Sequence, residues 1–312
     1  MLLQLFTLFA LAQPLFALFI HSKDGTQIYA EAQGNPANPA IVWVHGYISN
    51  SFIFDNVFQS QDYLSKYYMV RFDLRGFGLS DKPLDQAFYA SHKFAEDVDA
   101  VVQEFKLVKP FIAGWSYGGS ILADIYDLHG DGAISGFISF AGVPTAALAT
   151  NFSLPPLLAL FPNLLEDTNV TTSSSSAIQF AENLIYNPDA VTPQTMAMWV
   201  GLVEYTPQEV KELTITRVQN ATRLFSEGGP SLPFLYFVAE EDKSANGTAV
   251  AQYLQPKFKK FEVVSVPNSG HLPFLEGYEL VRDKISAFVQ NTTATAKRNE
   301  HRARRLAQRT RF

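Results

Sequence analysis

The chain has 312 residues, of which 47% are apolar and 17% charged, so it can bury a large core and is not a wholly disordered protein. Its net charge of −6 argues against nucleic acid as a partner, because no basic surface is expected over the main body. The absence of cysteine excludes a disulfide framework, thiol catalysis and thiolate metal binding.

The N-terminal segment is apolar. Residues 2–20 carry no charge and consist largely of Leu, Phe and Ala. We expect residues 1–20 to be a secretory signal peptide, with Ala10-Leu11-Ala12 as a small-x-small pattern and cleavage after Ala12. An uncleaved N-terminal anchor is the alternative, because the start lacks Lys and Arg and the apolar character continues past Ala12. A buried first strand would explain residues 16–20 alone. Membrane contact is expected only if the segment stays uncleaved.

Asn-X-Ser/Thr triplets support the secretory route, since they are acceptors for N-linked glycans. They lie in segments that read as loops or outer helices. Together with the leader they predict a secreted glycoprotein. The candidate glycosylation sites are Asn151, Asn169, Asn220, Asn246 and Asn291.

Short β-rich runs alternate with helix-length segments along the chain, which implies right-handed crossovers and an α/β fold. The predicted fold is a mostly parallel sheet with helices on both faces. The apolar runs at 40–44 and 233–238 suit strands that are buried on both sides. Strands are predicted at 26–32, 41–44, 67–72, 111–113, 136–140, 234–238 and 261–266, and helices at 94–105, 120–128 and 278–289.

The stretch between Pro144 and Pro230 interrupts this alternation, because it has helical runs but no strong strand pattern. We expect a helical cap at 145–230, inserted between two strands of a core formed by 21–144 and 231–290. Its apolar residues are expected to pack on the core, and to line an apolar pocket if the cap covers the site. The apolar residues singled out are Met196, Met198, Trp199 and Leu202.

The C-terminal segment, residues 291–312, contains many Lys and Arg but a single Glu. We expect it to be a basic, disordered tail. A tether to acidic surfaces is the alternative.

A glycine-rich turn, Gly114-Trp115-Ser116-Tyr117-Gly118, lies between the predicted strand 111–113 and the predicted helix 120–128. Ser116 on so sharp a turn is forced into strained backbone geometry, and Gly114 and Gly118 relieve the crowding around it. Its hydroxyl lies beside a helix N-terminus, whose free N–H groups favour developing negative charge. The turn therefore predicts a serine nucleophile.

A serine hydroxyl needs a base to take its proton, and the base needs a third group to orient it. Of six histidines, His271 is the candidate base, because it follows strand 261–266 at the strand end where sites collect in open α/β sheets. Asp242, after strand 234–238, is the predicted orienting acid, with Glu240 and Glu241 as fallback acids. The order Ser116, Asp242, His271 fits this architecture. Four further histidines are expected at the surface, namely His21, His92, His129 and His301, and His45 is considered below.

The negative charge that develops on the substrate oxygen needs two donors. The backbone N–H of Tyr117, directly after the nucleophile, is one candidate. The N–H of Tyr47 is the second, because Gly46 lets the backbone after strand 41–44 come close. His45 is expected to brace this turn and not to act as a base.

Matching segments occur in order within about residues 24–289: His45-Gly46, Asp73 to Ser80 (DLRGFGLS), Gly114 to Gly119, Glu241-Asp242 and Gly270-His271. In these segments the chain resembles the α/β-hydrolase superfamily, in its branch of cap-containing serine hydrolases. That branch includes esterases and cofactor-free haloperoxidases or perhydrolases. The resemblance implies an eight-stranded sheet, a cap at about 145–230, and a Ser-Asp-His triad that needs no metal or organic cofactor. It places Asp73 and Arg75 in a structural turn. The chain departs from the family pattern at Ala239 and Glu240, where glycine is usual.

The predicted reaction is hydrolysis of a carboxylic ester, or a related acyl substrate of modest apolar size, through an acyl-enzyme on Ser116. A small-molecule acyl substrate is the expected partner, and the oligomeric state is left open. Serine at this position argues against haloalkane dehalogenase and epoxide hydrolase chemistry, which use aspartate there in this superfamily. Perhydrolase or haloperoxidase, aminopeptidase and C–C hydrolase activities with the same triad stay open. So does a binding protein or receptor of the same fold with little turnover.

Overall fold

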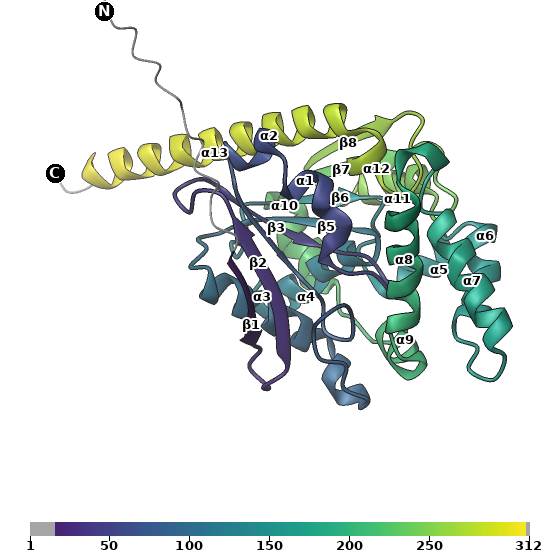
Figure 1. The fold of residues 1–312 in the computed structure, drawn as a ribbon. Helices are drawn as coiled ribbons and strands as arrows, with labels where there is room; N and C mark the ends of the chain where they lie inside the picture. The colour runs from purple at the N-terminus through teal and green to yellow at the C-terminus, as the bar shows by residue number, and fades with distance from the viewer. Residues whose placement is uncertain (1–15, 310–312) are drawn as a thin grey trace, which may run out of the picture.

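The computed structural model describes residues 16–309, in which eight strands form one sheet in the order β1-β2-β4-β3-β5-β6-β7-β8 (Figure 1). β2 pairs antiparallel with both β1 and β4, and the strands from β4 to β8 run parallel. The predicted mostly parallel eight-stranded sheet is confirmed. The strands are β1 (Phe16–His21), β2 (Gln27–Gln33), β3 (Ala40–Val44), β4 (Tyr68–Phe72), β5 (Phe111–Trp115), β6 (Gly136–Phe140), β7 (Pro233–Ala239) and β8 (Lys260–Val266).

Helices cover both faces of the sheet. α3 (Ser91–Glu104) and α4 (Ile121–His129) lie on one side, and α13 (Tyr278–Arg309) lies on the other (Figure 1). Strands β4, β5 and β6 are buried along their whole length, as expected for strands covered on both faces. The shorter core helices are α1 (Asp55–Phe58), α2 (Gln61–Leu64), α10 (Gly229–Ser231), α11 (Gly247–Leu254) and α12 (Pro273–Glu276).

Strand β1 includes residues that the sequence analysis assigned to the leader. It pairs with β2 from Phe16 opposite Ala32 to His21 opposite Gln27. Its side chains alternate, with Ile20 buried and Phe19 exposed, as is typical of an edge strand with one face on the core. Residues 16–20 of the expected leader are therefore part of the sheet, and the leader with its cleavage after Ala12 stays a prediction. Residues 1–15, with the pattern at Ala12, lie outside the described residues.

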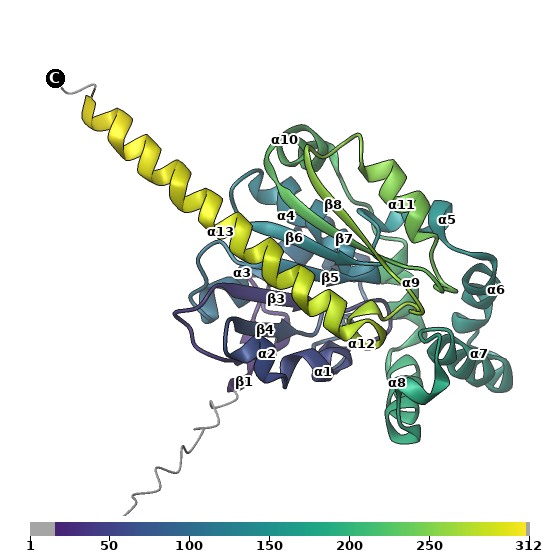
Figure 2. The same cartoon turned by 90° about the horizontal axis from the view of Figure 1, so that it is seen from above.

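The stretch between β6 and β7 is helical, as predicted, and its bounds at 145–230 stay a prediction. Figures 1 and 2 show its helices together on one side of the core. Two of them start at signals readable from the sequence: Asn169 caps α7 by accepting from the Thr172 N–H at 3.1 Å, and α8 begins at Pro193. The helices are α5 (Ala146–Phe152), α6 (Pro155–Leu164), α7 (Val170–Glu182), α8 (Pro193–Tyr205) and α9 (Gln208–Ile215).

The C-terminal segment differs from the expectation. Helix α13 begins at Tyr278, as predicted, but continues to Arg309, so the predicted disorder of 291–312 is wrong for residues 291–309. These residues contain neither Gly nor Pro and are rich in Ala, Arg and Thr, so nothing in them terminates the helix. The end of α13 projects well beyond the core (Figures 1 and 2). Among the described residues, no helix combines the length and the apolar character that crossing a membrane requires.

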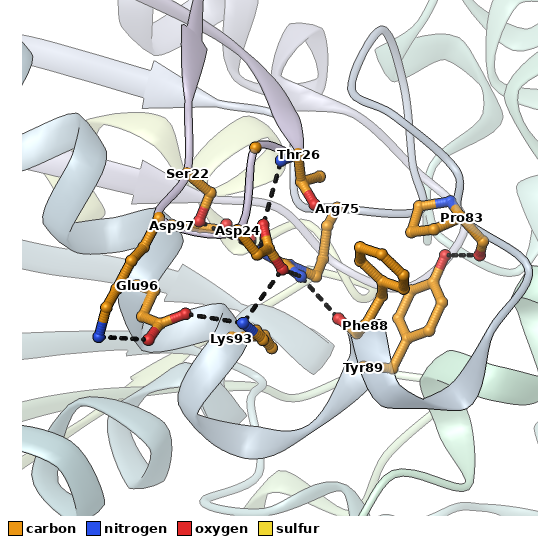
Figure 3. A network of polar contacts seen from close by, with 12 residues as sticks. Ser22, Asp24, Thr26, Arg75, Pro83, Phe88, Tyr89, Lys93, Glu96 and Asp97 are labelled. Atoms are coloured by element: carbon orange, nitrogen blue, oxygen red, sulfur yellow. Dashed lines mark hydrogen bonds and ion pairs between the residues drawn. The ribbon is translucent and has the colours of Figure 1, made fainter.

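The turn after β4 is held by a buried ion network (Figure 3). Arg75 donates to both carboxylate oxygens of Asp97, at 2.7 and 2.6 Å, and to Asp24 at 3.0 Å. Burial by itself would raise the pKa of Asp24, but hydrogen bonds from Arg75 and Thr26 outweigh it and hold this pKa below its usual range. Asp73 accepts from the Ser51 and Leu79 N–H groups at 2.7 Å each. The side chains of Arg75 and Asp73 thus stabilise the turn.

Candidate active site

Ser116 lies at the junction of β5 and the 3₁₀ turn Ser116–Ser120 that leads into α4. Its φ of +53° is in the left-handed region that a serine rarely adopts, so the strain predicted from the sequence is present. The glycines make the turn sterically feasible. A Cβ on Gly114 would come 2.5 Å from the Gly118 carbonyl oxygen, and one on Gly118 would come 2.3 Å from the Val44 carbonyl oxygen.

His271 and Asp242 lie together on the loops that follow β8 and β7. The His271 Nδ1 is 2.7 Å from Asp242 Oδ2, and both side chains are buried. An ionised carboxylate only accepts, so Nδ1 carries the proton toward Asp242 and Nε2 is left with its lone pair. Asp242 Oδ1 accepts from the N–H groups of Ser244 and Ala245 at 2.7 and 3.1 Å, which fixes the carboxylate. The geometry suits a base and its orienting acid.

The two fallback acids lie elsewhere. Glu240 accepts from the Ser265 hydroxyl at 2.5 Å, and the side chain of Glu241 is exposed. Their backbone N–H groups donate to the carbonyls of Val266 and Ser269 at 3.1 and 2.9 Å. These bonds tie the acid loop to the histidine loop without the glycine that is usual there.

The loop after β3 lies against Ser116, the candidate nucleophile. A Cβ on Gly46 would come 2.9 Å from the Trp115 ring and 3.1 Å from the Ser116 Cβ, so only glycine allows this approach. His45 Nδ1 donates to the Gly46 carbonyl at 2.7 Å, and its Nε2 accepts from the Leu74 N–H at 2.9 Å. His45 thus braces the turn, as expected. Burial lowers its pKa, which keeps the ring neutral.

Ser116 and His271 line the same cavity, whose volume is about 70 Å³. Tyr47, Trp115 and Tyr117 line it from the core. None of the four cap residues singled out from the sequence lines this cavity. Trp199 is buried in the cap, whereas Met198 is exposed. The cap contributes other apolar side chains to the lining, namely Leu157, Phe161, Phe180, Leu184 and Ile215.

Comparison with known proteins decides the family. The model of the Alpha/beta hydrolase family matches residues 41–284, which is more than half of the chain. The chain belongs to this family. Its fold is similar to that of the esterase RhEst1 from Rhodococcus sp., with a TM-score of 0.77 and 20% identity over 88% of this chain and 98% of that one.

Two curated relatives of this hydrolase match over shorter stretches. "Probable oxidoreductase EphD" of Mycobacterium tuberculosis is 34% identical over 91 residues, which are 29% of this chain and only 15% of that protein. Epoxide hydrolase 3 of Xenopus tropicalis is 27% identical over 104 residues, 33% of this chain and 28% of that protein.

Two residues of this hydrolase that the sequence analysis did not assign position the candidate base. The indole N–H of Trp115 donates to the His271 carbonyl at 2.7 Å. The Glu276 carboxylate accepts from the N–H of Gly270 at 2.7 Å and from those of Tyr186 and Asn187, in the loop that follows α7, at 2.9 and 2.8 Å. Trp115 could have been suspected because it precedes the candidate nucleophile. Glu276 carries no sequence signal, because its partners are backbone amides of a distant segment.

The remaining predicted positions lie away from the cavity. The five candidate glycosylation asparagines are all exposed, as an acceptor has to be, and their modification stays a prediction. Asn246 caps α11 by accepting from the Ala249 N–H at 3.0 Å. The histidines expected at the surface are not buried, and His129 pairs there with Asp99 at 2.8 Å.

Proposed function

We propose that this protein is a serine esterase that hydrolyses carboxylic esters with an apolar acyl group of modest size. One observation carries the proposal: Ser116, held at a φ of +53°, lines the same cavity as His271, whose Nδ1 is 2.7 Å from a buried Asp242 carboxylate. A strained serine, a base with a free Nε2 and an orienting acid are the parts that acyl transfer requires.

The proposed reaction has two steps. The Ser116 Oγ attacks the ester carbonyl while His271 Nε2 takes its proton, and Asp242 stabilises the imidazolium. The N–H groups of Tyr47 and Tyr117 hold the oxyanion of the tetrahedral intermediate. His271 then protonates the leaving alcohol, which leaves an acyl group on Ser116. A water molecule, deprotonated by His271, hydrolyses this acyl-enzyme and restores the serine.

The lining of the cavity supports a neutral acyl group. His271 is the only residue with an ionisable acid or base group other than tyrosine among the described residues that line it. A substrate carboxylate or ammonium would lose its hydration there without gaining an opposite charge, which is costly. The cavity therefore favours an uncharged ester over the charged amine of an aminopeptidase substrate. Ser116 at the nucleophile position also separates this chain from the aspartate chemistry expected of an epoxide hydrolase.

The test is ester turnover by the purified protein and by Ser116→Ala, across p-nitrophenyl esters of increasing acyl length, with a fluorophosphonate probe alongside. We expect the probe to label the wild type, and the wild type to turn over esters with short acyl groups fastest. Ser116→Ala should lose both the labelling and the ester turnover. Ser65→Ala, at an exposed serine outside the cavity, is the matched control. A wild type with neither labelling nor turnover would exclude the esterase and favour a binding protein.

We also propose that the protein is secreted and glycosylated. The apolar N-terminal segment and the exposure of all five sequon asparagines support this location. Endoglycosidase treatment of the protein from its native host should increase its electrophoretic mobility. An unshifted band would count against secretion.

A further inference from the structure

The two tyrosines that flank the nucleophile reach from the core into one cap helix. The Tyr47 hydroxyl donates to the Lys211 carbonyl at 2.8 Å, and the Tyr117 hydroxyl donates to the Thr214 carbonyl at 2.8 Å. Both carbonyls belong to α9, which lies at the foot of α8 (Figure 1). Both tyrosines are buried, and their rings are 6.0 Å apart. The cap and the nucleophile turn are thus joined by a pair of hydrogen bonds.

The chemistry of the groups fixes the direction of the Tyr117 bond. Arg217 Nε donates to the Tyr117 hydroxyl oxygen, so this hydroxyl directs its own proton to the Thr214 carbonyl. Burial raises the pKa of Tyr117 to about 12, which keeps the hydroxyl protonated. Thr214 lies in the last turn of α9, where carbonyls have no partner within the helix. The tyrosine therefore satisfies a carbonyl that would otherwise be buried without a partner.

Arg217, on the cap, also binds to the core next to the turn that carries Ser116. Its guanidinium donates to Asp124 Oδ1 at 2.9 Å and to the Ser120 hydroxyl at 3.0 Å, on the turn and helix that follow the nucleophile. The Arg217 and Asp124 side chains are fully buried. Asp124 Oδ1 also accepts from the Ser91 hydroxyl at 2.5 Å and from the Gln219 side-chain amide at 2.9 Å, so the buried pair is part of a larger hydrogen-bond network. Helix α9 is therefore held in one position over the turn that carries Ser116.

The backbone N–H groups of these same tyrosines are the proposed oxyanion donors, so this inference rests on the proposed function. Donors to a developing oxyanion act only when they are fixed in place before the reaction. We propose that the Tyr47 and Tyr117 hydroxyls are positioning groups, which couple the seating of cap helix α9 to the alignment of the oxyanion donors. When α9 packs on the core, the backbone N–H groups of Tyr47 and Tyr117 are held in alignment. When the cap moves away from the core, they lose this alignment.

Tyr47→Phe and Tyr117→Phe test this coupling, because each removes a hydroxyl and keeps the ring and the backbone N–H. We expect kcat for a short-chain ester to fall about tenfold in each variant and further in the double variant, with KM little changed. The pH profile should keep its shape, since His271 is untouched. Tyr126→Phe is the matched control, because its hydroxyl, on α4, donates to Asp131 at 3.3 Å away from the cavity.

Hydrogen–deuterium exchange gives a readout that does not need turnover. In both tyrosine variants, amides in 45–48, 116–119 and 208–215 should exchange about tenfold faster than in wild type and in Tyr126→Phe. Unchanged exchange in these segments, or kcat equal to that of Tyr126→Phe, would overturn the coupling. A wild type without ester turnover would instead defeat the proposed function, and exchange would still decide the coupling.

Discussion

Asp242 fixes the imidazole of His271 through one carboxylate oxygen and its own loop through the other. In Asp242→Asn an amide N–H2 can face Nδ1, which favours the wrong histidine tautomer and removes the charge that stabilises the imidazolium. We expect kcat for ester hydrolysis to fall about 10³–10⁴-fold with an unchanged circular dichroism spectrum. Glu240→Gln should keep wild-type turnover. The reverse result, activity lost in Glu240→Gln alone, would make Glu240 the orienting acid.

Because the neutral ring of His45 is buried, we expect the protein to lose stability in weak acid. Burial lowers the pKa of this ring below the ordinary value of 6.5, and both ring nitrogens are used by the neutral form. Above pH 6.5 the ring is neutral in the folded and unfolded states, so its contribution to stability is complete. Below pH 6.5 the unfolded chain binds a proton that the folded protein resists, so stability falls until the lower, folded pKa is reached.

The measurement is the unfolding temperature at pH 7 and at pH 5. We expect a drop between the two that is smaller in His45→Gln, although this variant starts from a lower value because it disturbs the brace on Leu74. His92→Gln, at an exposed histidine, should show the same drop as the wild type. A drop of equal size in His45→Gln would show that other groups cause the acid sensitivity.

At the residue scale, the strained turn at Ser116 and the contact between Asp242 and His271 could be predicted from the sequence, and their catalytic roles stay a proposal. Ser116 could be predicted because a glycine-flanked serine between a strand and a helix is typical of a nucleophile turn, and Asp242 and His271 follow from their positions after strands. Glu276 could not be predicted. Its role depends on amides from the loop after α7 that approach it only in the folded protein.

The effect of a glycine-to-alanine substitution on stability depends on the atoms that surround the added methyl group. A Cβ on Gly118 would come 2.3 Å from the Val44 carbonyl oxygen, whereas one on Gly201, within α8, has nothing within 4 Å. We expect Gly118→Ala to lower the free energy of unfolding by about 3 kcal/mol or more and to abolish ester turnover. Gly201→Ala should raise this free energy by about 0.5–1 kcal/mol, since alanine favours the helix. Denaturant titration measures both. A stable, active Gly118→Ala would contradict the close contact.

At the scale of elements, strands and core helices could be predicted because their apolar runs are continuous. The differences from expectation lie at the two ends and in the cap. Residues 16–20 are apolar enough for a leader, but they alternate as an edge strand does. Residues 291–309 were expected to be disordered from their charge, although their composition favours a helix. In the cap, Leu157 and Phe161 are spaced by four residues, as are Phe180 and Leu184, and both pairs face the cavity.

Hydrogen bonds join the cap to the core at several places, among them those of Arg217 and the two tyrosines, those of Glu276, and the Leu154 N–H to the Ser244 carbonyl at 2.9 Å. We therefore expect cap and core to unfold together, in one calorimetric transition whose van 't Hoff and calorimetric enthalpies agree. Glu276→Ala leaves three amides without their carboxylate and should lower the transition temperature by roughly 5 °C without splitting it. Glu279→Ala, at an exposed position three residues away, should leave this temperature unchanged. Two separate transitions in the wild type would mean that the cap is an independent unit.

Trp115 gives the whole protein an optical reporter of its own site. Its indole is buried, hydrogen-bonded to the His271 backbone, and its ring centre is 5.5 Å from that of the imidazole. An imidazolium next to an excited indole quenches its emission, whereas a neutral imidazole does so far less. Rapid mixing with an ester, followed by the intrinsic fluorescence, can therefore report on the imidazole of His271 without any added label. Trp115→Phe would provide the background from Trp43 and Trp199.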